Sequence, residues 1–91
     1  MKINKRKILH DIELQYRKER KLNPAYPDHI CGMSNKVSIA AGELSKSADE
    51  VKYYTSTCEA VYELQKDAVY ENAIKLMAVT MRMLQNLKKI N

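Results

Sequence analysis

Apolar residues near the start of the chain recur at helical spacing. Ile8, Ile12 and Tyr16 fall on one face at intervals of four, with Leu9 beside them. Asn4 stands just before this pattern, where its side chain can cap the first free N–H groups of a helix. The pattern predicts an amphipathic helix over about residues 4–21.

A second stretch of the chain has a seven-residue repeat. Ile30, Val37, Leu44 and Val51 recur at that interval, and Met33 and Ala40 take the positions between them. This predicts a helix over about residues 29–53, capped by Asp28 and preceded by a loop with Pro24 and Pro27. We expect Gly42, inside this helix, to permit a close approach of another helix, since an interior glycine otherwise costs about 1 kcal/mol.

The last stretch predicts a helix over about residues 57–88 with two unlike halves. Ser56 and Glu59 form a capping box, after which residues 59–71 are amphipathic. Residues 73–84 are apolar on almost every face, and a helix of that kind is buried all round. Since two other helices of a short chain can scarcely cover it, we expect a second subunit there. The expected interface residues are Ile74, Met77, Met81 and Leu84.

Together these patterns predict a single all-α domain over residues 1–91, with three helices, the second and third of them long, that assembles into an oligomeric helical bundle. The chain has 91 residues and a small core, and many such chains associate. The apolar segment of residues 73–84 is too short and too charged to span a membrane. The basic N-terminus is not followed by an apolar stretch such as a signal peptide has. We therefore expect a cytoplasmic protein with Cys31 and Cys58 reduced.

The net charge is unevenly placed along the chain. Residues 1–23 carry eight lysines or arginines and three acidic residues, whereas residues 24–91 carry eight of each. A local excess of positive charge attracts phosphates, nucleic acid or an acidic protein surface. A solvated helix face that keeps the protein soluble would have the same composition. The candidate ligand-binding residues are Arg6, Arg17, Lys18, Arg20, Lys21 and Lys46.

Carboxylates on the third predicted helix lie four residues apart and form an acidic ridge, at Glu59, Glu63, Asp67 and Glu71. If the second and third helices are antiparallel neighbours, Glu43 and the later acids of this ridge can meet and hold Mg²⁺. A solvated ridge paired with lysines explains the same pattern. His10, His29 and Cys31 lack a second ligand pair at zinc spacing, so a structural zinc site is not expected.

Five short segments resemble a known family: ILHDIE (8–13), YPDHI (26–30), AGELSK (41–46), YENAI (70–74) and AVTMRML (78–84). Their order is similar to that of small phage and prophage proteins of the MazG-like all-α NTP pyrophosphohydrolase superfamily. The resemblance implies helical dimers or tetramers in which acids on two helices hold Mg²⁺ for nucleoside triphosphate cleavage. Glu43 and Glu71 match acids of that family, whereas Ile39, Ala40 and Asn72 replace others. Loss of these carboxylates argues against catalysis.

Four functions follow as hypotheses. The first is a non-catalytic homodimer or homotetramer that binds or sequesters a nucleotide or nucleotide signal. The second is a protein-interaction module, such as an inhibitor of a host enzyme, whose basic first helix docks on an acidic surface. The third is a Mg²⁺-dependent hydrolase that uses Glu43, Asp67 and Glu71 as metal ligands. Direct DNA binding is a fourth and weaker hypothesis, because no helix-turn-helix pattern accompanies the basic residues.

Overall fold

A computed structural model describes residues 3–24, 30–54 and 59–87, without the side chains of residues 52–54 and 59–61. It contains three helices, α1 (Lys5–Leu22), α2 (Ile30–Tyr54) and α3 (Glu59–Asn86). The described ranges contain no strand, so the predicted all-α fold is confirmed there. The helix ends lie within two residues of the predicted bounds. The predicted caps Asp28 and Ser56 fall outside the described residues.

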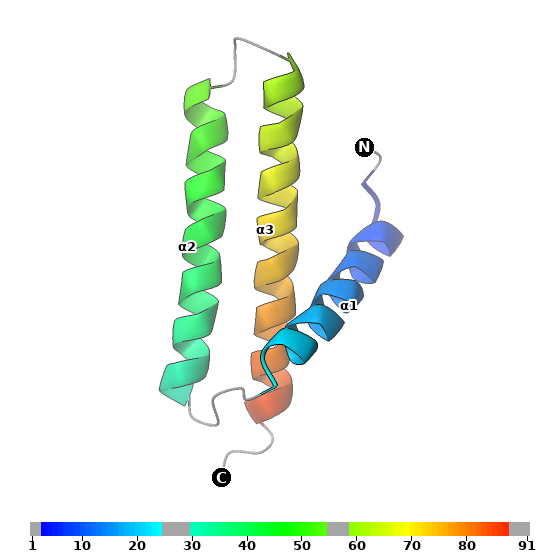
Figure 1. Cartoon of the computed structure of the whole chain (residues 1–91), viewed down its shortest axis with the longest axis vertical. Helices are drawn as coiled ribbons and strands as arrows, with labels where there is room; N and C mark the ends of the chain where they lie inside the picture. The colour runs from blue at the N-terminus through cyan, green and yellow to red at the C-terminus, as the bar shows by residue number, and fades with distance from the viewer. Residues whose placement is uncertain (1–2, 25–29, 55–58, 88–91) are drawn as a thin grey trace.

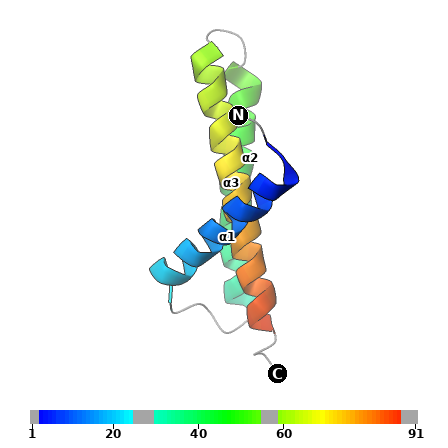
Figure 2. The same cartoon turned by 90° about the vertical axis from the view of Figure 1, so that its right-hand side faces the viewer.

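The helices α2 and α3 lie side by side and antiparallel, and form a long hairpin (Figure 1). The α1 helix packs against α3 and crosses it obliquely on the side away from α2 (Figure 2). The resulting molecule is elongated, with extents of 52 × 26 × 20 Å. No helix in the described part of the chain is both long and apolar enough to cross a bilayer.

The α1 helix begins as its sequence predicts. The Asn4 side chain accepts a hydrogen bond from the Lys7 backbone N–H at 2.9 Å, which satisfies one of the free donors of the first turn. Tyr16 is buried, and Ile8 and Ile12 are half-buried on the same side. Leu9 is exposed, because it lies at the edge of that narrow apolar stripe. Its predicted place in the packed face is therefore wrong.

The seam between α2 and α3 is built from small and flexible side chains. Met33 is fully buried, and Ala40 and Ser47 follow it at intervals of seven residues. Ser47 satisfies its hydroxyl within α2 by donating to the Leu44 carbonyl at 2.9 Å. Among the described side chains of α3, the buried ones are Ile74, Ala78, Val79 and Arg82.

Two details of the predicted α2 packing differ from the structure. Ile30 is exposed, and the other residues of its seven-residue repeat are only half-buried. The reason is that Met33, Ala40 and Ser47, which are also seven residues apart, point more directly at α3. Gly42 is also exposed, and a Cβ atom added there would meet nothing within 4 Å. The expectation that Gly42 permits a close helix approach is therefore wrong within this chain.

Candidate functional site

A groove of about 490 Å³ lies between α1 and α3. Its apolar lining residues are Leu14, which is exposed, and Ile74, which is buried, and its other lining residues include charges of both signs. A volume of this size is typical of sites for small molecules. The polar residues that line the groove are Lys7, Asp11, Gln15, Lys18, Asp67, Tyr70 and Glu71.

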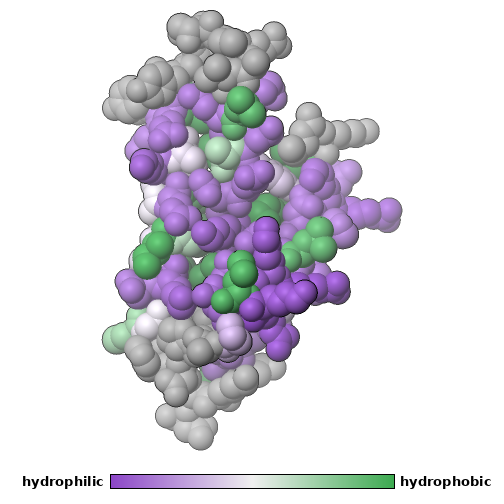
Figure 3. Space-filling view, viewed as in Figure 1, coloured by the Kyte–Doolittle hydropathy of each residue, from purple (hydrophilic) through white to green (hydrophobic). Residues whose placement is uncertain are grey.

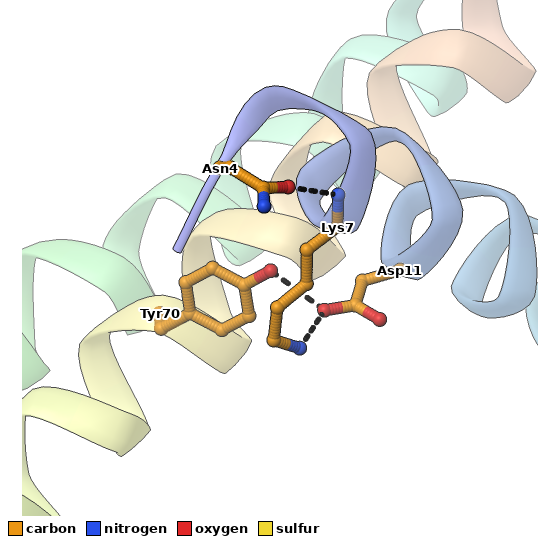
Figure 4. A network of polar contacts seen from close by, with 4 residues as sticks. All are labelled: Asn4, Lys7, Asp11 and Tyr70. Atoms are coloured by element: carbon orange, nitrogen blue, oxygen red, sulfur yellow. Dashed lines mark hydrogen bonds and ion pairs between the residues drawn. The ribbon is translucent and has the colours of Figure 1, made fainter. Parts of the chain in front are cut away.

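At one end of this groove, three side chains join α1 to α3 (Figure 4). Lys7 donates to Asp11 Oδ2 at 2.6 Å, and the Tyr70 hydroxyl donates to the same oxygen at 2.6 Å. The Lys7 ammonium also lies 5.3 Å from the centre of the Tyr70 ring. We call these three residues the α1–α3 polar cluster.

The pKa values of the polar cluster follow from these contacts. The hydrogen bonds from Lys7 and then Tyr70 lower the pKa of the Asp11 carboxyl, because they stabilise its charged form. The hydrogen bond to Asp11 raises the pKa of Tyr70, with a further contribution from burial, and it also raises the pKa of Lys7. Asp11 is thus held ionised and occupied by its neighbours, which makes it a structural contact between helices.

A second and smaller groove of about 170 Å³ lies where α2, α3 and the end of α1 meet. Glu43 lines it and pairs with Lys75 of α3, with 3.3 Å between Oε2 and Nζ. Asn72 also donates to the Glu43 backbone carbonyl at 3.4 Å. The Glu43 carboxylate therefore faces a lysine here.

The structure does not bring together the predicted metal ligands Glu43, Asp67 and Glu71. Asp67 and Glu71 line the groove beside α1, whereas Glu43 lines the groove beside α2. The two grooves are separate because α1 and α2 pack on different sides of α3. Within the described residues, no group of three or more His, Cys, Asp or Glu side chains is placed to hold a metal ion.

Four of the predicted ligand-binding residues gather in the last turns of α1, and one of them, Lys18, also lines the groove between α1 and α3. Arg17, Lys18, Arg20 and Lys21 are exposed around an open surface depression of about 670 Å³. We call these four residues the basic patch. On the face shown in Figure 3, hydrophilic residues cover most of the surface, and apolar residues form separate patches.

The members of the basic patch differ in their contacts. Arg17 pairs with Glu13 at 3.1 Å, and the Arg20 guanidinium lies 5.8 Å from the centre of the Tyr16 ring. Lys18 and Lys21 form no ion pair with any other described residue. Arg6 is exposed near the start of α1 and Lys46 is exposed on α2, and neither lines the depression. The patch is therefore a local feature of the last turns of α1.

One buried residue at the contact between α1 and α3, which we call the α1–α3 joint, was not predicted from the sequence. Arg82 lies within the apolar segment of α3, yet only 7% of it is exposed. Its Nη1 donates at 3.0 Å to the Glu19 carbonyl, which also accepts from the Asn23 N–H at 2.9 Å. This carbonyl lies near the C-terminal end of α1, where the helix dipole favours a cation. The one sequence signal for this contact with α1 is that the arginine lies inside an apolar segment.

Comparison of the chain with protein-family models, with curated proteins and with solved structures finds no match. The resemblance to MazG-like proteins therefore stays a hypothesis. The class that the structure defines is a three-helix protein with a long hairpin and a basic helix across it.

Proposed function

We propose that this chain is a non-catalytic protein-interaction module that docks the basic patch of α1 on an acidic surface of a partner protein. The observation that carries the proposal is the exposure of all four basic residues around one open depression. An open surface with one sign of charge fits an extended partner of opposite charge and speeds the encounter with it. A small ligand, by contrast, is held where walls surround it.

The grooves give less support to a nucleotide as the ligand. In the groove between α1 and α3, Asp11, Asp67 and Glu71 stand against Lys7 and Lys18, so three carboxylates oppose a phosphate. The groove beside Glu43 has about 170 Å³, which is below the 300 Å³ or so at which small-molecule pockets begin. Hydrolysis has even less support, because Glu43 lies apart from Asp67 and Glu71.

The proposal can be tested by fluorescence anisotropy with a labelled decaglutamate peptide, labelled ATP and a labelled DNA duplex as probes. We expect Lys21→Glu to weaken decaglutamate binding about tenfold at low salt, since it reverses a charge of the patch that forms no ion pair with the other described residues. Lys46→Glu is the matched control, because it makes the same change on another helix. Binding should also weaken as salt rises, since the screening length is about 8 Å at physiological ionic strength.

Other outcomes of this experiment point elsewhere. Tighter binding of ATP than of decaglutamate, lost in Lys21→Glu, would support the nucleotide hypothesis instead. The same pattern with the duplex would support DNA binding. Equal affinities of Lys21→Glu and Lys46→Glu for every probe would contradict the proposal and leave the charges a role in solubility and in stabilising the end of α1.

We also propose that the module self-associates in a reducing cytoplasm. Two exposed residues of the expected interface, Met77 and Leu84, support self-association, whereas Ile74 is buried within the chain. Cys31 is a free and exposed thiol, as a reducing compartment would keep it.

A further inference from the structure

The side of α3 that faces neither α1 nor α2 carries a continuous apolar stripe. Its members recur at intervals of three and four residues, and none is charged. Met77 is 45% exposed, Leu84 is 56% exposed and Leu87 is also exposed, whereas the other three members are half-buried. What sets these residues apart from the other exposed apolar side chains is their succession along one face of α3. We call this stripe the open face; it consists of Val69, Ala73, Met77, Thr80, Leu84 and Leu87.

The open face can be buried without leaving a polar side chain unpaired. Its one hydroxyl belongs to Thr80, whose Oγ1 donates to the Leu76 carbonyl within α3 at 2.7 Å. Burying a hydroxyl without a hydrogen-bond partner costs free energy. Because Thr80 already bonds to the Leu76 carbonyl, covering this face does not incur that cost. Ala41 lies about 200° around α2 from Ile39 and Glu43, which line the smaller groove. It therefore adds a small apolar side chain to the flank of α2 next to this face.

Charge distribution favours a second copy of this chain as the occupant. The excess positive charge of the chain lies within residues 1–23, whereas residues 24–91 have equal numbers of acidic and basic residues. Two hairpins can therefore meet through their open faces without net repulsion, while α1 lies on another side of α3 (Figure 2). A nucleic acid or a strongly acidic protein would find no counter-charge on the six residues of this face.

From these observations we infer that two copies pair through their open faces as an antiparallel, twofold-symmetric dimer; this inference rests on the self-association proposed above. In antiparallel pairing, Ala73 of one copy faces Leu84 of the other, and Met77 faces Thr80. At both of these central levels the larger side chain meets a smaller one, so the middle of the two faces interlocks. Parallel pairing would place Ala73 against Ala73 and Leu84 against Leu84, which leaves a gap at one level and crowding at the other.

The size of the face sets the strength of the dimer. From Val69 to Leu87 the stripe is about 27 Å long, at 1.5 Å per residue. With a helix width near 10 Å and the neighbouring flank of α2, it buries on the order of 300–600 Å² per copy. A standard stable interface buries about 800 Å² per partner, so we expect dissociation in the micromolar range.

The first test is the mass of the protein in solution across micromolar concentrations, by sedimentation equilibrium. We expect a reversible transition from the 10.5 kDa chain to twice that mass. Leu84→Asp should abolish the dimer, whereas the matched control Leu64→Asp, at an exposed leucine outside the open face, should retain it. Both variants should keep wild-type helicity, since neither side chain is buried in the chain. A monomer throughout, or a dimer unaffected by Leu84→Asp, would overturn the pairing.

The second test addresses orientation, in a background with Cys31→Ser and Cys58→Ser. Ala73→Cys and Leu84→Cys chains should each fail to cross-link alone under mild oxidation, but a mixture of the two should give a disulfide-linked dimer with one of each. Efficient cross-linking of either variant alone would overturn the antiparallel arrangement while leaving self-association intact. Binding of decaglutamate by the basic patch is measured separately, so its failure is distinguishable from either result.

Discussion

The two helices that pack on α3 are held by different means. Against α2, the seam consists of small or flexible side chains such as Met33 and Ala40, packed at seven-residue intervals. Against α1, three polar contacts span the joint: Tyr70 to Asp11, Tyr16 to Gln85, and Arg82 to the Glu19 carbonyl. The polar contacts of Glu43 with Lys75 and Asn72 also join α2 to α3, but they are exposed, whereas those of the α1–α3 joint are partly buried. The α2–α3 seam therefore depends mainly on shape, and the α1–α3 joint depends more on hydrogen-bond partners. The first should respond to changes of volume and the second to the loss of single atoms and to pH.

The largest effect should come from the α2–α3 seam. Met33 is fully buried, so Met33→Ala leaves a cavity and should lower the free energy of unfolding by about 2–5 kcal/mol. Urea unfolding followed by circular dichroism measures this. Leu64→Ala, at an exposed leucine, is the control and should change it by less than about 0.5 kcal/mol. A loss below about 1 kcal/mol in Met33→Ala would show that the seam is looser than its burial indicates.

A smaller loss should follow from the α1–α3 joint. Arg82→Met keeps much of the apolar stem but removes the donor to the Glu19 carbonyl, and should cost about 1.5–3 kcal/mol, the range for hydrogen bonds of charged groups. Amide hydrogen exchange should show the loss concentrated in the last turns of α1. Arg17→Met, at an exposed arginine of α1, should leave exchange in those turns unchanged. A neutral result for Arg82→Met would mean that the stem alone fills the joint.

The same contrast explains what could be predicted from sequence. Apolar periodicity and the Asn4 cap are local signals, so they placed all three helices within two residues of their observed ends. The Tyr70–Asp11 and Arg82–Glu19 contacts join residues 59 and 63 positions apart, and they depend on the angle at which α1 crosses α3. The acids of the predicted metal site share helical spacing along α3, yet spacing could not show that α1 and α2 take different sides. Glu43 therefore meets Lys75 instead of Asp67.

A gain should come from the outer side of α2. Gly42 is exposed inside the helix, and a Cβ atom there would have open space. Gly42→Ala should therefore raise the free energy of unfolding by about 0.5–1 kcal/mol, because alanine loses less backbone freedom in a helix. Chemical denaturation at a monomeric concentration measures it. A loss that grows with protein concentration would instead show that another copy packs against this position.

The smallest effect should be that of the partly exposed α1–α3 polar cluster, and it should depend on pH. The pKa of Asp11 is lowered in the folded chain, so its contribution to stability is present above the ordinary value of 3.8 and is lost as the pH falls through the lower folded value. The pKa of Tyr70 is raised, so its contribution is complete below the ordinary value of 10.0 and is lost as the pH rises through the higher folded value. Melting temperatures across pH should therefore fall less steeply above pH 10 in Tyr70→Phe than in wild type. Tyr62→Phe, at a tyrosine whose ring lies against Lys66 and outside the cluster, should keep the wild-type profile. If Tyr70→Phe also keeps the wild-type profile, the hydrogen bond from Tyr70 to Asp11 does not stabilise the packing of α1 on α3 in solution. The contacts of Arg82 and Tyr16 would then stabilise that packing without the polar cluster.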